Sequence, residues 1–325
     1  MSALNSISEE EQKLAKYLVS PDEKIRNNAI KALESYIKNN SKFDDLDMLK
    51  LWKALYYCYW YSDKSVAQLE LANALAKFIH KFKSSKFSFL FFRMFLRTIL
   101  REWHFIDQYR INKFYNLIRF ILRESFIYIK SSTLWNENEF RELLEILEEE
   151  ILNKTPNGVR FHVAEIFLPE LLVASEGIIS DSVLNVSLHP FYRILKKCED
   201  NVFVDRVIEK IFLNFATKYS VESESLSLDS SDNSSYKFIN VSLEPLRENL
   251  FEAAAEESTR QSNRQKIYEI HNEYKKIIKL NKRMKNHDSI SSKENSKSSK
   301  TNSRNLDSSE SSNLKKKRKK SSAEN

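Results

Sequence analysis

The stretch at 48–61 decides the fold and reads MLKLWKALYYCYWY. Its apolar residues recur at spacings of three, four and seven, which is the period of one broad face of an α-helix. The residues on this face are Met48, Leu49, Trp52, Leu55, Tyr56, Tyr59 and Trp60. Nowhere does the chain alternate between apolar and polar residues for long enough to predict a strand. The sequence therefore predicts an amphipathic helix here and helices elsewhere.

The same period returns at 66–82, 114–122 and 204–215. Ser20 followed by a proline and two acids predicts a helix N-terminus with Ser20 as its cap. Asp107 is predicted to cap the helix that runs to about Lys130. We expect about ten to twelve helices, joined by short polar turns, which would pair into units of roughly 40 residues. The predicted fold class is all-α, a HEAT-like stack of antiparallel helix pairs with a disordered basic C-terminal tail.

The composition of the 325 residues excludes several classes of protein. With 2 glycines, at 158 and 177, the chain cannot contain a dinucleotide-binding loop, a P-loop or a nucleophile elbow. Cys58 and Cys198 are 140 positions apart in apolar stretches, which favours free thiols in a reducing compartment. No signal peptide or membrane-spanning segment is visible, so we expect a soluble intracellular protein without a membrane partner.

Charge divides the chain unevenly. Residues 281–325 hold 13 Lys and Arg against 5 Asp and Glu, while the whole chain has a net charge of +7. The sequence predicts four parts: a helical body at 1–219, an acidic Ser-rich loop at 220–235, a helical extension packed on the body at 236–284, and a disordered Ser/Lys-rich tail at 285–325. The tail has too few apolar residues to offset the entropy lost on ordering.

No group of residues predicts an enzyme. His104 lies between Glu102 and Asp107, and a histidine with acidic neighbours could act as a general acid or base. The alternative is structural: Asp107 caps the next helix, and His104 forms a hydrogen bond in the turn. The histidines and cysteines lack the spacing of metal ligands, and we expect no catalytic residue, metal, cofactor or small-molecule substrate.

Basic residues concentrate between 77 and 130. Arg93, Arg97 and Arg101 follow one another at four-residue spacing and share a helix face, and Arg119 and Arg123 repeat this spacing. Such a stripe can track a phosphate backbone. The candidate RNA- or partner-binding residues are Arg93, Arg97, Arg101, Arg110, Lys113, Arg119 and Arg123. The alternative is that these arginines pair inside the fold with the acidic helix at 137–150. That helix otherwise has a solvated face or a docking face for a basic partner.

The tail ends in six consecutive cations, which is typical of a nuclear-localisation or nucleic-acid-binding segment. These residues are Lys315, Lys316, Lys317, Arg318, Lys319 and Lys320. The alternative is a segment that only increases solubility.

Several stretches resemble the ribosomal RNA processing protein 1 family. The most specific are LWKALYYCYWYSDK at 51–64 and REWH at 101–104, the latter followed by Ile106-Asp107, Arg110 and Lys113-Phe114-Tyr115. Weaker matches are Gly158, His162, Leu168, Glu170-Leu171, Pro190-Phe191-Tyr192, 247–251 and 263–268. Ala54 and Phe105 stand where the family usually has glycine, so the segment after His104 either forms a different turn or continues as helix.

The resemblance implies a non-catalytic assembly factor of the nucleus and nucleolus. Such a factor would act in rRNA processing and in maturation of the large (60S) ribosomal subunit, as a helical scaffold in pre-60S particles. Its partners would be pre-60S assembly factors and pre-ribosomal RNA. The residues themselves leave one alternative, a HEAT-like nuclear adaptor that binds acidic partners and has no ribosomal role.

Overall fold

The fold is all-α in the residues that the computed structural model describes, which are 13, 16–18, 20, 22–40, 42–220 and 237–283. Within these ranges the only β-type pairing is an isolated bridge between Ser220 and Phe238. The acidic loop predicted at 220–235, apart from Ser220, and the tail predicted at 285–325 lie outside the described residues. The predicted helical class is therefore confirmed, and the predicted division into four parts stays a prediction.

The chain forms two compact units, Met1–Tyr274 and Lys275–Asn325. The first half of the larger unit contains α2 (Glu23–Asn39), α3 (Asp45–Trp60), α4 (Ser65–Lys77), η2 (Phe78–Lys81), α5 (Ser85–Glu102), η3 (Trp103–Phe105), α6 (Ile111–Thr133), α7 (Glu137–Leu147) and η4 (Glu148–Leu152). Its second half contains α8 (Asn157–Ser175), α9 (Asp181–Lys197), α10 (Asn201–Val207), η5 (Ile208–Leu213), η6 (Phe215–Tyr219) and α11 (Leu243–Ala255). Residues 261–283 are also helical, and 275–283 are the described part of the second unit.

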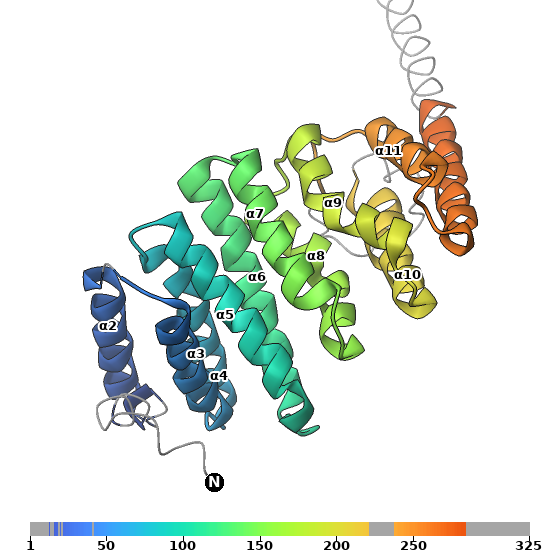
Figure 1. Cartoon of the computed structure of the whole chain (residues 1–325). Helices are drawn as coiled ribbons and strands as arrows, with labels where there is room; N and C mark the ends of the chain where they lie inside the picture. The colour runs from blue at the N-terminus through green and yellow to red at the C-terminus, as the bar shows by residue number, and fades with distance from the viewer. Residues whose placement is uncertain are drawn as a thin grey trace, which may run out of the picture. The chain divides into compact units, whose positions relative to one another are not determined.

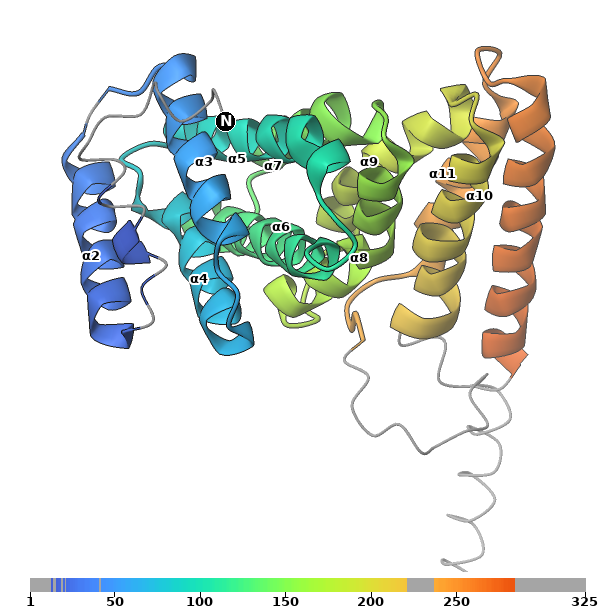
Figure 2. The same cartoon turned by 90° about the horizontal axis from the view of Figure 1, so that it is seen from below.

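The helices of the larger unit pack in two rows (Figures 1 and 2). In one row α3 contacts α5, α5 contacts α7, α7 contacts α9, and α9 contacts α11. In the other row α4 contacts α6, α6 contacts α8, and α8 contacts both α10 and η5. Each helix therefore packs against the helix two further along the chain, so residues about one helix pair apart become neighbours.

Two helix starts differ from their predicted positions. The cap of α2 is Asp22, whose Oδ1 accepts a hydrogen bond from the backbone N–H of Lys24 at 2.8 Å, so the helix begins after the predicted Ser20 cap. Asp107 accepts from the backbone N–H groups of Tyr109 and Arg110, both at 3.0 Å, and α6 begins at Ile111. Asp22 thus caps α2 directly, whereas Asp107 bonds the turn that leads into α6, whose N-cap residue is Arg110.

Buried aromatic side chains join the first helices. Trp52 is buried on α3, and its indole N–H donates to the carbonyl of Phe91 on α5 at 2.7 Å. The hydroxyl of Tyr59 donates to the carbonyl of Lys113 on α6 at 2.8 Å. Trp103 is buried in η3, and its indole ring lies against Gly158, where an added Cβ would lie 3.1 Å from Nε1. The first two contacts hold α3 against α5 and α6, and the third holds η3 against α8.

The chain reverses tightly after α8. Glu176 and Gly177 both have left-handed backbone conformations, with φ of 56° and 75°. The carbonyl of Gly177 accepts from the N–H of Ile239 at 3.0 Å, and an added Cβ at Gly177 would lie 2.6 Å from the carbonyl oxygen of Lys237. Glycine is required here both by its φ and by this close backbone approach.

Other features bear on the predictions from sequence. Cys58 is a buried free thiol and Cys198 a half-buried one. Among the described helices, none combines the length and the apolarity that crossing a bilayer demands. Phe105 lies in the 3-10 helix η3 with its side chain exposed, so the segment after His104 continues as a helical turn.

Candidate functional site

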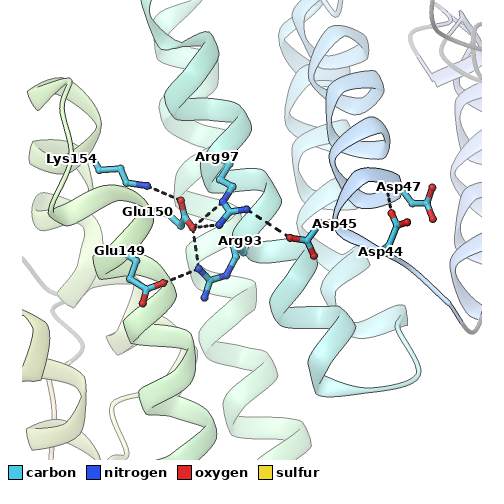
Figure 3. A network of polar contacts seen from close by, with 8 residues as sticks. All are labelled: Asp44, Asp45, Asp47, Arg93, Arg97, Glu149, Glu150 and Lys154. Carbon is cyan, nitrogen blue, oxygen red and sulfur yellow. Dashed lines mark hydrogen bonds and ion pairs between the residues drawn. The ribbon is translucent and has the colours of Figure 1, made fainter.

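The predicted arginine stripe begins on α5 and is engaged in ion pairs (Figure 3). Nη1 of Arg93 donates to Oε2 of Glu149 at 2.8 Å and to Oε1 of Glu150 at 3.0 Å. Nε of Arg97 donates to the same Glu150 oxygen at 2.9 Å. For these two arginines the structure therefore shows the pairing with the acidic helix that the sequence left open as an alternative to RNA.

Glu150 is the centre of this network. Its side chain is 3% exposed, and Nζ of Lys154 donates to its second oxygen at 3.0 Å. Burial alone would raise the pKa of the Glu150 carboxyl, but the hydrogen bonds from Arg97 and Lys154 outweigh burial and hold the pKa below its ordinary value. The carboxylate is therefore charged in the folded protein at neutral pH, and three cations compensate it.

The acidic run on α7 and η4 is solvated only in part. Glu137, Glu142, Glu145 and Glu149 are exposed, whereas Glu148 and Glu150 are buried. The expectation of one solvated face is wrong for these two residues. Glu148 follows the buried Leu144 by four positions, and Glu150 follows the buried Leu143 by seven, so helical periodicity turns both inward. Glu148 is compensated by Arg193 on α9, whose Nη2 lies 2.9 Å from Oε2.

Arg97 and Arg101 are more accessible than Arg93, the third arginine of the stripe on α5, because their side chains are 43% and 47% exposed. Nη1 of Arg97 lies 3.9 Å from the Asp45 carboxylate in the first turn of α3, where Asp44 and Asp47 also lie (Figure 3). Nε of Arg101 donates to the adjacent Glu102 at 2.9 Å. These two guanidinium groups retain donors on a surface that water reaches.

Arg119 and Arg123 on α6 share one acceptor that sequence reasoning missed. Nη1 of Arg119 and Nε of Arg123 each donate to a different oxygen of Glu170 at 2.6 Å. Glu170 lies on α8 with its side chain 1% exposed, so these arginines do not pair with the helix at 137–150. The available signal was a single carboxylate in an otherwise apolar helical stretch, because a charge in such a position needs a partner.

Arg110 and Lys113 lie at the start of α6, where the two most specific family-like stretches meet. Arg110 forms an ion pair with Asp107, and its guanidinium lies over the Trp60 ring, 5.1 Å from the centroid. Nζ of Lys113 donates to the carbonyls of Trp60 at 2.7 Å and Ser62 at 2.9 Å. Burial lowers the pKa of Lys113 to about 8. Lys113 therefore satisfies the carbonyls at the end of α3 as well as bearing charge.

The histidine predicted as a possible acid or base is not oriented by its acidic neighbours. Glu102 bonds Arg101, Asp107 bonds Arg110, and the ring of His104 is exposed without a hydrogen bond to either carboxylate. Across the described ranges, no three His, Cys, Asp or Glu side chains gather as a metal site would require. The predicted localisation residues Lys315–Lys320 lie outside the described residues.

The fold and these contacts define a class, an all-α protein with two rows of helices in which buried glutamates form ion pairs with the next helix of the same row. Comparison with known sequences gives the family. A family model described as nucleolar protein Nop52 matches residues 9–324, and the chain belongs to this family.

Curated relatives carry the name ribosomal RNA processing protein 1 homolog. The human homolog B is 36% identical over 211 residues, which is 62% of this chain and 28% of that protein. The human homolog A is 35% identical over 233 residues, covering 68% of this chain and 50% of the relative. The Dictyostelium discoideum homolog is 28% identical over 287 residues, covering 81% and 58%. The matched part of the chain thus covers between 28% and 58% of the length of these relatives.

Proposed function

We propose that this protein is a non-catalytic nucleolar assembly factor that acts in rRNA processing and in maturation of the large (60S) ribosomal subunit. The observation that carries the proposal is the match of the nucleolar Nop52 family model to residues 9–324. The names of the relatives, which refer to ribosomal RNA processing, point the same way. The partners in this proposal are pre-60S assembly factors and pre-ribosomal RNA.

The proposed mode of action is that of a helical scaffold. Packing of each helix on the helix two further along the chain supports a HEAT-like stack of antiparallel pairs. Ion pairs follow the same rule, since Arg93 and Glu150 are 57 positions apart and Arg119 and Glu170 are 51. Such a stack offers an extended surface to several partners at once, which is what an assembly factor without chemistry of its own requires.

Sedimentation of a nuclear extract tests this proposal. The tagged full chain should co-migrate with precursors of the large subunit and with their rRNA, and it should be absent from small-subunit precursors. Depletion of the chain should increase the amount of unprocessed large-subunit precursor rRNA. If the chain stays in the light fractions and depletion leaves precursor rRNA unchanged, the nuclear-adaptor alternative is the better account.

The proposal also includes RNA contacts by the basic residues at 93–123. Arg97 and Arg101 are best suited to this role because their side chains are half-exposed. We expect Arg97→Glu with Arg101→Glu to weaken RNA binding and to reduce its salt dependence, since each phosphate contact releases about one counterion. Because Arg97 also bonds the buried Glu150, binding is measured at a temperature at which circular dichroism shows the variant to be folded. Lys24→Glu with Lys31→Glu is the matched control, because it makes the same charge change on exposed positions of α2. An equal loss in both pairs would show that only net charge matters.

A further inference from the structure

A cleft of about 470 Å³ lies where the α3–α4 turn meets the start of α6. Its walls include Asp63, Gln68, Tyr109, Arg110, Asn112 and Lys113, and Asn116 completes the lining. Among these described lining residues there is no aliphatic side chain. The volume is within the range of small-ligand sites, and the lining offers one aromatic ring, three amides, two cations and one carboxylate.

Tyr109 presents an unpartnered aromatic ring at this cleft. The residue is 86% exposed, although its backbone N–H is fixed by the Asp107 carboxylate at 3.0 Å. No other ring of the described chain packs on Tyr109, and its hydroxyl makes no hydrogen bond there. An aromatic face held in water by a fixed backbone is a surface on which another flat group can stack.

Amide groups lie beside this ring. Asn112 and Asn116 are four residues apart on α6 and therefore lie on the same helix face. Both are exposed, and neither amide has a hydrogen-bond partner within the described chain. Gln68 donates its amide N–H to the Ser62 carbonyl at 2.7 Å, which leaves its own oxygen as an acceptor. Amides that both donate and accept match the polar edges of nucleobases.

The two cations of the cleft, Arg110 and Lys113, are held in place by hydrogen bonds but do not use all of their donors. The Lys113 ammonium has three donors, and it gives two of them to the carbonyls of Trp60 and Ser62. Arg110 gives Nη1 to Asp107, and its remaining donors are not used by a second acidic residue in the described chain. Lys113 is 7% exposed, so its stem is fixed and the charge stays at the cleft. Arg110 and Lys113 therefore keep donors from which a phosphate can accept, beside the Asp63 carboxylate that also lines the cleft.

We propose that this cleft binds one unpaired nucleotide of a single-stranded RNA. The base stacks on Tyr109, its edge bonds the amides of Asn112 and Asn116, and the adjacent phosphate is attracted by Arg110 and Lys113. This inference rests on the proposed function, which gives the chain an RNA partner. A polar lining favours RNA over an apolar protein segment, and a base in a duplex has no free face for Tyr109.

Direct binding with the full chain tests the cleft. The probes are a fluorescent single-stranded RNA oligonucleotide and the duplex of the same sequence, both at raised salt so that non-specific phosphate contacts contribute little. We expect Tyr109→Ala to weaken single-strand binding on the order of 5- to 150-fold, the range for losing one stacked base. Duplex binding should not change, and Tyr109→Phe should retain most of the affinity. Tyr36→Ala, which removes an exposed tyrosine from α2, should change neither.

A second variant examines the base edge. Asn112→Asp with Asn116→Asp should weaken single-strand binding more than Asn27→Asp with Asn28→Asp, which adds the same two charges to exposed positions of α2. Thermal unfolding of the Tyr109 and asparagine variants should stay close to that of the wild type, because these side chains are exposed.

Two outcomes would overturn the proposal. One is equal single-strand affinity of Tyr109→Ala and wild type. If that variant nevertheless leaves the ribosomal precursors, the cleft docks a protein. The other is an equal loss of affinity for single-stranded and duplex RNA in Tyr109→Ala, which would mean that the cleft contributes only non-specific electrostatic attraction. Conversely, Tyr109→Ala could weaken single-strand binding alone while the wild-type chain never sediments with ribosomal precursors. That result would support the nucleotide-binding cleft and reject the proposed function.

Discussion

Removal of the cations around Glu150 should cost more stability than removal of Glu150 itself. Glu150 is the buried member of the network, with Arg93 at 3.0 Å, Arg97 at 2.9 Å and Lys154 at 3.0 Å. Arg93→Met with Arg97→Met leaves the buried carboxylate with Lys154 alone. Stranding a buried charge costs about 3–5 kcal/mol of unfolding free energy.

Glu150→Gln should be milder. The guanidinium groups that it leaves are partly solvated, and Arg93 keeps its bond to Glu149 at 2.8 Å. Glu150→Gln then loses only charge-assisted hydrogen bonds, which lowers the unfolding free energy by about 1.5–3 kcal/mol. Combining Glu150→Gln with the two arginine changes should restore part of the stability, because no buried charge is left without a partner.

Thermal unfolding followed by circular dichroism measures the order of these effects. At about 2–4 °C per kcal/mol for a domain of this size, the arginine pair should lower Tm by roughly 6–20 °C and Glu150→Gln by roughly 3–12 °C. The reasoning is refuted if Glu150→Gln is the more damaging change, or if the combined variant is simply the sum of the two. RNA affinity measured on the same variants separates the structural role of Arg93 and Arg97 from a binding role.

The pH dependence of stability provides a second test of the role of the Glu150 carboxylate. The pKa of Glu150 is held below its ordinary value in the folded protein, so the unfolded chain binds more protons as the pH falls. The stability that Glu150 contributes is complete above its unfolded pKa and is lost as the pH falls through the lower folded value. Glu150→Gln should therefore flatten the acid side of the stability profile, which unfolding in urea at a series of pH values would record.

Three further predictions concern other parts of the chain. Burial lowers the pKa of His162 to about 4, so stability should fall by about 2 kcal/mol from pH 7 to pH 5, and His162→Gln should remove this part in urea unfolding. Gly177→Ala should lower Tm more than Gly158→Ala, because at Gly177 the φ of 75° and the Lys237 carbonyl both oppose a side chain, whereas at Gly158 the neighbour is the Trp103 ring. Replacing Lys315–Lys320 by alanine should reduce nuclear and nucleolar accumulation without changing Tm, and unchanged accumulation of a tagged chain would point to import with a partner.

The helical class could be predicted because periodicity and glycine scarcity are local properties of the sequence. Trp52 and Tyr59 were placed on an inward face by spacing alone, and both are buried. The partner of Arg119 and Arg123 could not be found in this way, because Glu170 becomes their neighbour only when α6 and α8 pack. The cleft beside Tyr109 was missed for a related reason, since its walls come from two turns about 45 residues apart in the chain.

Long-range polar contacts show why no repeat is readable in the residues although the packing repeats. Arg26 bonds Glu70, His80 bonds Glu124, and Arg160 bonds Asp200, at separations of 44, 44 and 40 positions. Each pair joins segments about one helix pair apart, and the acid is the later residue in all three, yet the residue types and their sequence surroundings differ. What recurs is the distance along the chain between the basic residue and the carboxylate that it contacts, and not a sequence motif. Because each contact spans neighbouring helix pairs only, we expect a broken ion pair to destabilise its own neighbours first. Hydrogen exchange in the Arg93→Met with Arg97→Met variant should therefore rise in α5, α7 and η4 before it rises in α9 or α11, and a uniform rise would mean that the helices unfold as one unit.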